Sequence, residues 1–373
     1  MLRKFPGKVK RIIIKVGSSV IATDQMKPRM AHLRSLVAQV SAIRRRNIDV
    51  ILVSSGAIVL GMGELNRKHR SSDLASLQAL AAIGQTVLMR KYDELFKRNK
   101  QKCAQLLLTW DDFDNRLRHN NARNTLRTML EWGVIPVINE NDTISTDEIK
   151  FGDNDKLSAL VASLVQADLL VLLSDVEGFY DLKGGEKKLF EEIKEITREI
   201  EGFASGRSSH SVSAVNPTAK KHMSKGGMAA KLDAIKVATQ AKIPCIIANG
   251  ETEDVLLRIL KGERIGTLFM EKEEKVLARK HWISFGAKPK GSVIVDNGAR
   301  QALLKGGKSL LLPGVVGWEG HFKKDDVVVV RDEDDHEIAR GITNYSTTML
   351  QAIEEKKGQR ELIHCDNLVL CKR

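Results

Sequence analysis

The stretch Arg11-Ile-Ile-Ile-Lys-Val-Gly-Ser-Ser19 decides the fold that we expect for this 373-residue chain. Residues 11–16 are mostly apolar and β-branched, which is typical of a strand that is buried on both faces of a sheet. Gly17, Ser18 and Ser19 follow at once and favour a tight turn at the end of that strand. Lys15 is charged within the apolar run, and on this pattern alone it is equally compatible with a solvated side chain near a strand end.

The same texture recurs along the chain as apolar strands that alternate with amphipathic helices. This alternation predicts an α/β fold, a three-layer α/β/α sandwich around a mainly parallel sheet. The further predicted strands are 49–54, 103–109, 134–139, 168–174 and 243–248, and the predicted helices are 30–46, 73–99, 120–131, 156–166 and 252–261.

Polar clusters follow four of these strands, at 17–19, 54–56, 139–142 and 174–175. Parallel sheets bind ligands beyond the carboxyl ends of their strands, where these clusters are expected to meet. Each cluster alone could equally cap an ordinary turn. Together they predict a ligand site at this edge of the sheet.

A two-glycine segment precedes another predicted helix, in Lys225-Gly-Gly-Met-Ala-Ala-Lys-Leu232. We expect Gly226 and Gly227 to form a turn whose backbone N–H groups face an anion, with Lys231 beside it at the start of a helix that runs to about Ala241. An ordinary turn fits this pattern as well. Residues 202–227, rich in Ser, Gly, Lys and His, are expected to form a long loop before the helix.

The chain is expected to divide into residues 1–270, a linker at 271–287 and a small β-rich domain at 288–373. The formal net charge is +13, and residues 1–287 carry 46 basic and 34 acidic side chains, against 14 and 13 in the C-terminal domain. This excess is compatible with acidic small molecules or nucleic acid as partners, but a solvated basic surface explains most of these side chains equally well. The short C-terminal strands are predicted at 292–296, 309–312, 327–331 and 337–341.

No apolar run approaches the length of a membrane span, and the N-terminus lacks the apolar core of a secretory signal. The four cysteines are dispersed without the spacing of metal ligands. A cytoplasmic location without membrane attachment is therefore expected. The four scattered tryptophans, Trp110, Trp132, Trp282 and Trp318, are expected to pack in cores.

With these motifs in order, the chain resembles the amino acid kinase family and, within it, the glutamate kinase branch. The C-terminal domain resembles a PUA domain. The motifs that carry the resemblance are Lys15-Val-Gly-Ser-Ser19, Ser54-Ser-Gly-Ala-Ile58, Asn139-Glu-Asn-Asp142, Phe151-Gly-Asp-Asn-Asp-Lys-Leu-Ser158, Ser174-Asp-Val-Glu-Gly-Phe-Tyr180, Gly226-Gly-Met228 with Lys231, Gly291-Ser-Val293 and 309–315.

The resemblance implies transfer of phosphate from ATP to the γ-carboxylate of L-glutamate, with Mg²⁺, as the first step of proline biosynthesis. It also implies a homodimer or homotetramer and inhibition by proline. A carboxylate nucleophile is ionised at neutral pH and needs no general base. Catalysis of such a transfer comes mainly from positioning and electrostatic stabilisation, which suits a pair of lysines.

On this resemblance Lys15 and Lys231 would contact the transferring phosphoryl group, and Asp175 would orient these lysines or approach Mg²⁺, whose direct ligands stay open. The nucleotide would contact Lys15, Gly17, Ser174, Asp175, Lys225, Gly226, Gly227, Met228 and Lys231. Glutamate would contact Ser55, Gly56, Ala57, Asn139, Asp142, Asp153, Asn154 and Asp155. Asx-turns and helix caps are the alternative roles of the last group, and Asp155 before Lys156 is a credible cap.

Two departures from the family pattern concern the nucleotide side. Residues 181–185 replace an expected Pro-Arg turn, and Lys225 stands where a small residue is usual, so the base preference stays open. Two alternatives also remain: a kinase of the same fold acting on aspartate, acetylglutamate or carbamate, and an RNA-binding protein with a PUA-like domain. The C-terminal domain has a net charge near zero, which argues against strong binding to the phosphate backbone of RNA.

Overall fold

The computed structural model describes residues 3, 5, 7–71, 73–144, 154–181, 188–205, 225–271, 280, 283, 287, 289–305, 307–352 and 361–371. The chain divides into two compact units. The larger one contains Met1–Asp112 and Arg116–Lys275, and the smaller one contains Phe113–Asn115 and Val276–Arg373. The predicted boundaries at 270 and 288 stay predictions, because most residues between them lie outside the described part.

An eight-stranded sheet forms the centre of the larger unit, in the order β3-β4-β2-β1-β5-β9-β10-β8. Every neighbouring pair is parallel except β9 with β10, which confirms the mainly parallel sheet. The strands are β1 (Arg11–Val16), β2 (Asp49–Ser54), β3 (Lys102–Leu108), β4 (Val134–Glu140), β5 (Leu169–Ser174), β8 (Glu192–Ile193), β9 (Cys245–Asn249) and β10 (Thr267–Phe269), and a separate hairpin joins β6 (Tyr180–Asp181) to β7 (Lys188–Leu189).

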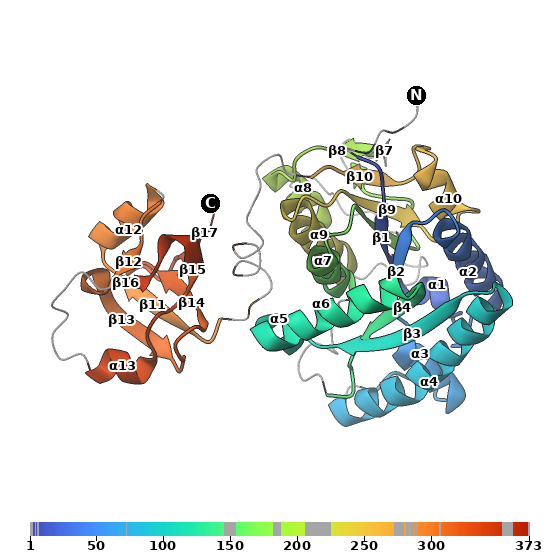
Figure 1. Cartoon of the computed structure of the whole chain (residues 1–373), viewed down its shortest axis with the longest axis horizontal. Coiled ribbons are helices and arrows are strands. Elements are labelled where there is room, and N and C mark those ends of the chain that lie inside the picture. Colours follow the sequence, from blue (N-terminus) through green and yellow to red (C-terminus); the bar gives the residue numbers. More distant parts are fainter. Residues whose placement is uncertain are drawn as a thin grey trace, which may run out of the picture. The chain divides into compact units, whose positions relative to one another are not determined.

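Helices cover both faces of this sheet, and Figure 1 shows α2 and α10 on one side with α7 and α9 on the other. The predicted three-layer sandwich is therefore confirmed. The helices of this region are α1 (Ser18–Ile21), α2 (Met30–Arg44), α3 (Ala57–Glu64), α4 (Leu74–Arg98), α5 (Asp111–Asp114), α6 (Arg116–Glu131), α7 (Asn154–Val165), α8 (Arg198–Ser205), α9 (Lys225–Gln240) and α10 (Val255–Leu260).

Strand β1 lies between β2 and β5, and its successive side chains point to opposite faces of the sheet. Ile12, Ile14 and Val16 are fully buried in an apolar cluster that includes residues of α2, α4 and α10. Lys15, between Ile14 and Val16, must therefore point to the opposite face, which α7 and α9 cover. This alternation brings a lysine into the protein interior, where its buried side chain needs a charged partner.

Two sequence expectations near α9 are wrong. Residues 202–205 belong to α8 instead of a loop, and Lys225 begins α9, so that Gly226 and Gly227 lie inside its first turn instead of in a turn before it. The first turn of a helix still leaves its N–H groups without partners inside the helix, so helical glycines keep the expected donors. Residues 206–224 of the predicted loop lie outside the described residues.

The smaller unit contains a five-stranded sheet in the order β13-β11-β14-β15-β17 and a two-stranded sheet of β12 and β16. The four predicted C-terminal strands are confirmed as β11, β12, β14 and β15. In the described part of the chain, no helix is both long and apolar enough to cross a bilayer. The elements are β11 (Gly291–Val295), α12 (Asn297–Leu304), β12 (Leu310–Leu311), β13 (Val315–Gly320), β14 (Val327–Arg331), β15 (Glu337–Ile342), α13 (Thr347–Ala352), β16 (Glu361–Ile363) and β17 (Leu368–Leu370).

Helices α3 and α4 cross so closely that glycine is required on both. A Cβ at Gly84 would lie 1.7 Å from the carbonyl oxygen of Ala57, and one at Gly61 would lie 2.0 Å from that of Leu80. Both obstacles are backbone atoms, which cannot rotate away as a side chain can. The two helices therefore form one packed pair, in which α3 starts directly after the turn at 54–56.

Replacing Gly84 by alanine tests this crossing. We expect Gly84→Ala to destabilise the larger unit by about 1–3 kcal/mol, because the added carbon must push α3 and α4 apart. Gly202→Ala is the matched control, since nothing lies within 4 Å of its Cβ position in helix α8. Urea unfolding should show the control to be neutral or slightly stabilised; equal midpoints for both variants would contradict the interpretation.

Candidate active site

The side chains of Lys15 and Lys231 meet on one carboxylate. The Lys15 Nζ lies 2.6 Å from Oδ1 of Asp155, and the Lys231 Nζ lies 3.0 Å from Oδ2 of the same residue. Lys15 and Asp155 are buried and Lys231 is nearly so, with exposed fractions of 7%, 8% and 12% for the three side chains. The structure thus brings together the two predicted lysines, which lie far apart in the sequence.

Three different elements supply this triad. Lys15 comes from β1, Asp155 from the first turn of α7 and Lys231 from the second turn of α9. Burial alone would raise the pKa of Asp155, but the two ammonium groups outweigh it and hold the pKa below its ordinary value. The carboxylate therefore stays ionised and leaves a net positive charge, which suits an incoming polyanion.

Asp175 is not the carboxylate on which the two lysines meet, and its predicted approach to Mg²⁺ stays a prediction. It is exposed, and its Oδ1 accepts a hydrogen bond of 2.9 Å from the Ser174 hydroxyl. Within the described residues the carboxylate that orients both lysines is Asp155, which the sequence had placed only at the border of the glutamate site or as a cap. Asp155 lies inside α7, so the cap interpretation is wrong.

A second group of polar side chains forms a buried hydrogen-bond network beside the triad. The Asn154 Nδ2 donates to Ser55 Oγ at 3.0 Å and to Asn139 Oδ1 at 2.9 Å. The Asn139 Nδ2 donates in turn to Gln85 Oε1 at 2.8 Å. Three of the predicted glutamate contacts, Ser55, Asn139 and Asn154, therefore adjoin one another although they come from three segments.

Gln85 is a member of this network that the sequence analysis missed. It lies on the buried face of α4, between Ala81 and Leu88. A polar residue among apolar ones at helical spacing was the available signal. The Gln85 Nε2 and the Asn154 Oδ1 are buried and have no hydrogen-bond partner among the described residues. Buried unpaired groups of this kind fit a site that a polar ligand completes.

The turns at the ends of β1 and β2 differ in what they offer a ligand. Gly56 has φ +100°, a left-handed conformation that favours glycine, and Ala57 follows as the first residue of α3. The Gly17 N–H, expected to face a phosphate, instead donates to the carbonyl of Leu173 at 3.0 Å. Gly17 therefore borders the site without offering that donor.

Asp142 follows β4 and is half-buried. Burial raises the pKa of its carboxyl from 3.8 to about 6, and the nearby charge of Arg70 opposes this shift. A cationic partner would restore its charge, which is the behaviour expected of a carboxylate that receives a substrate ammonium group. Asp153, another predicted glutamate contact, and the side chain of Lys225 lie outside the described residues.

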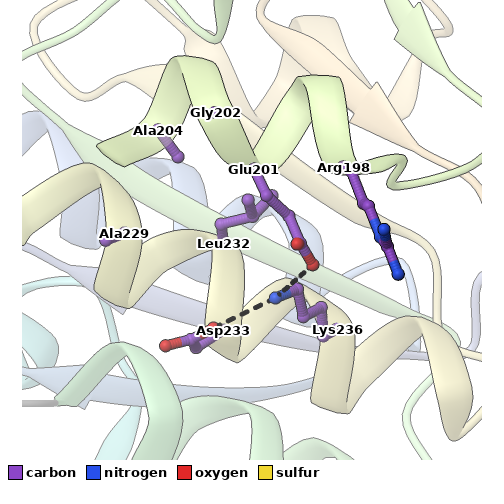
Figure 2. A pocket seen from close by; sticks show the side chains of 8 residues that line it. All are labelled: Arg198, Glu201, Gly202, Ala204, Ala229, Leu232, Asp233 and Lys236. Carbon is purple, nitrogen blue, oxygen red and sulfur yellow. Dashed lines mark hydrogen bonds and ion pairs between the residues drawn. The ribbon is translucent and has the colours of Figure 1, made fainter. Parts of the chain in front are cut away.

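A surface pocket of about 420 Å³ lies between α8 and α9 and is separate from this site. Figure 2 shows Glu201 of α8 reaching Lys236 of α9, at 2.8 Å, with Asp233 on the same nitrogen at 3.4 Å. Neither Lys15 nor Lys231 lines this pocket. Three of its charged groups, Glu201, Asp233 and Lys236, are paired with one another, so its chemistry differs from that of the triad.

The family can now be stated. Residues 10–249 match the family model of the amino acid kinase family, and residues 291–364 match the PUA domain. The chain belongs to the amino acid kinase family. Nearly all of the matched residues 10–249 belong to the larger unit, which carries the triad.

Relatives of known name match this amino acid kinase over nearly its whole length. The glutamate 5-kinase of Geobacter metallireducens is 45% identical over 97% of this chain and 98% of its own. That of Geobacter sulfurreducens is 43% identical over 98% of both. A solved UMP kinase from Bacillus anthracis has a TM-score of 0.46 and 13% identity, over 71% of this chain and 98% of its own.

Removing the central carboxylate should destabilise this kinase domain. Asp155→Asn would leave two buried ammonium groups without a counter-charge, and we expect it to lower the free energy of unfolding by about 3–5 kcal/mol. Asp175→Asn is the control, because its carboxylate is exposed. Denaturant unfolding of both variants checks this; an Asp155→Asn protein as stable as the control would contradict a buried charge triad.

Proposed function

We propose that this protein is a glutamate 5-kinase, which transfers the terminal phosphoryl group of ATP to the γ-carboxylate of L-glutamate. The observation that carries the proposal is the pair of lysines on Asp155 next to the network of Ser55, Asn139 and Asn154. The first element suits a polyphosphate and the second an amino acid. Relatives named glutamate 5-kinase, which span nearly the full chain, support this choice of substrate.

The residues present fit ATP and Mg²⁺. The first turn of α9 supplies N–H donors from Gly226, Gly227 and Met228 together with a partial positive charge, and Lys231 lies one turn further on. Asp155 is already engaged by two ammonium groups, whereas Asp175 is exposed. We therefore infer that Asp175, beside Ser174, would hold Mg²⁺ directly or through water, and the ion would neutralise phosphate charge.

In the proposed mechanism the protein positions two anions against each other. Ser55 would donate its hydroxyl to a carboxylate of glutamate. Asp142 would receive the α-ammonium group, together with the Asn154 Oδ1, which has no hydrogen-bond partner among the described residues. Lys15 and Lys231 would draw the transferring group towards the γ-carboxylate and stabilise charge on its oxygens. An oxygen–phosphorus bond forms as the bond to the bridging oxygen breaks, and ADP leaves. No proton needs to be removed, because the nucleophile is already ionised.

The finer assignments belong to the same proposal. The product would be γ-glutamyl phosphate, the first intermediate of proline synthesis. A cytoplasmic location agrees with ATP as substrate and with four free cysteines. Inhibition by proline and assembly into dimers or tetramers stay predictions, which inhibition kinetics and light scattering would test.

Hydroxamate formation from amino acid, ATP and hydroxylamine tests the proposal directly. We expect product with L-glutamate and none above background with aspartate or N-acetylglutamate. Product with one of these acids and none with glutamate would favour the kinase alternatives. Salt-sensitive RNA binding without glutamate-dependent ATP turnover would favour an RNA-binding protein.

Lysine substitutions test the assignment of the phosphoryl site. We expect Lys231→Ala to lower kcat by roughly 10²–10³-fold while the glutamate KM changes little, because its contact strengthens as charge develops in transfer. Lys236→Ala is a control on the same helix, since Lys236 pairs with Glu201 and Asp233 away from the triad. Steady-state kinetics check both, and an unchanged kcat for Lys231→Ala would refute its role.

The raised pKa of Asp142 gives a pH signature. Its carboxyl is protonated in the free enzyme below about pH 6 and then cannot pair with an ammonium group. We expect kcat/KM for glutamate to fall about tenfold per pH unit below that value, well above the ordinary pKa of the glutamate side chain, near 4.3. The Asp142→Asn variant should have a lower kcat/KM at neutral pH, and this kcat/KM should not fall further between pH 6 and pH 5. A wild-type profile that is flat down to pH 5 would contradict the assignment.

A further inference from the structure

The first turn of α7 carries two buried polar residues of the site side by side. Asn154 contacts the acceptor network from β2 and β4, and Asp155 contacts the two lysines from β1 and α9. Errors in the placement of this turn would therefore disturb the glutamate contacts and the phosphoryl contacts together. The segment that leads into it, residues 145–153, lies outside the described residues.

The next residue of this turn, Lys156, has an aromatic partner. Its Nζ lies 4.1 Å from the centroid of the Trp110 ring, within the range of a cation–π interaction. Both side chains are half-buried, and such an attraction strengthens as water is excluded. Trp110 thus contacts the side chain that follows Asn154 and Asp155 in α7, and it is half-buried, whereas the sequence had suggested a core residue.

Trp110 stands on a rigid support that is tied to the same site. It follows β3 by two residues, and β3 pairs with β4 so that Leu107 lies opposite Asn139. The turn at its base is closed by Asp112, which accepts hydrogen bonds from the Thr109 N–H at 2.7 Å and the Thr109 hydroxyl at 3.0 Å. The ring is therefore fixed to the strand pair that carries Asn139.

Residues 154, 155 and 156 are consequently anchored to three different parts of the sheet. Successive side chains of a helix point about 100° apart, so three such anchors act from three directions. The rest of α7 is mostly buried and packs against the sheet and α9, which already holds the helix in place. The contact with Trp110 adds a constraint at the exposed side of its first turn, next to Asn154 and Asp155.

We propose that Trp110 is a positioning residue for phosphoryl transfer: its ring holds Lys156 and so fixes the turn that presents Asn154 and Asp155. This inference rests on the proposed function for its kinetic consequence. Its structural content, the anchoring of α7, can be measured without any activity.

The kinetic test compares Trp110→Leu, which removes the ring, with Trp110→Phe, which keeps an aromatic face. We expect Trp110→Leu to lower kcat/KM for glutamate about tenfold, equivalent to about 1.4 kcal/mol, with the ATP KM within about twofold of the wild type. Trp110→Phe should recover most of this loss. Trp132→Leu is the matched control, because Trp132 follows α6 and is 76% exposed. Its kcat/KM for glutamate should equal that of the wild type.

A double-mutant cycle with Lys156→Met separates the contact from the charge of the lysine. If the ring acts through Lys156, Trp110→Leu should cost little further activity once Lys156 is methionine. Fully additive losses, wild-type kcat/KM in Trp110→Leu, or a loss in Trp110→Phe as large as in Trp110→Leu would each overturn the proposal. Should Trp110→Leu fail to fold, Trp110→Met, which also lacks the ring but keeps much of the bulk, takes its place in the cycle.

Hydrogen exchange tests the anchoring itself. Amides of residues 154–165 should exchange faster in Trp110→Leu than in Trp132→Leu, with α2 unchanged in both. Equal exchange in α7 would refute the proposal even in an active enzyme. If the wild type makes no glutamyl hydroxamate but α7 loosens as expected, the proposed function fails and the positioning role of Trp110 stands.

Discussion

The active site depends on one carboxylate between two cations. Lys15 and Lys231 repel each other and both lie largely out of water, so Asp155 between them supplies the counter-charge that this arrangement needs. The triad also joins β1, α7 and α9, and it thereby fixes the separation of the sheet from the helical layer at the site. The side chains that we expect to bind the polyphosphate are therefore the same ones that hold β1, α7 and α9 together.

Much of the fold could be predicted from local pattern. Apolar β-branched runs such as 11–16 identify buried strands, and all six predicted strands of the larger unit lie in its eight-stranded sheet. The two strands that were missed, β8 and β10, have two and three residues, too few to show a period. The clustering of polar residues at the carboxyl ends of strands likewise predicted that side chains such as Ser55 and Asn139 lie close together.

The pairing of charges within the site could not be predicted from pattern. Asp153, Asp155 and Asp175 are equivalent as residue types, and only the start of α7 at Asn154 decides that Asp155 points at the lysines. The two glycines looked like a turn because glycine disfavours helices, yet α9 begins at Lys225 and includes them. Gln85 was hidden because its partners, Asn139 and Asn154, lie in remote segments.

The glycine crossing of α3 and α4 limits how this site can be redesigned. Gly56 leads into α3 and Gln85 lies on α4 next to Gly84, so the two walls of the acceptor network are locked in one rigid block. A longer or bulkier amino acid cannot be accommodated by sliding these helices apart without breaking backbone contacts. Engineering of a new acceptor must therefore begin outside this block, for example at Asp142, which follows β4.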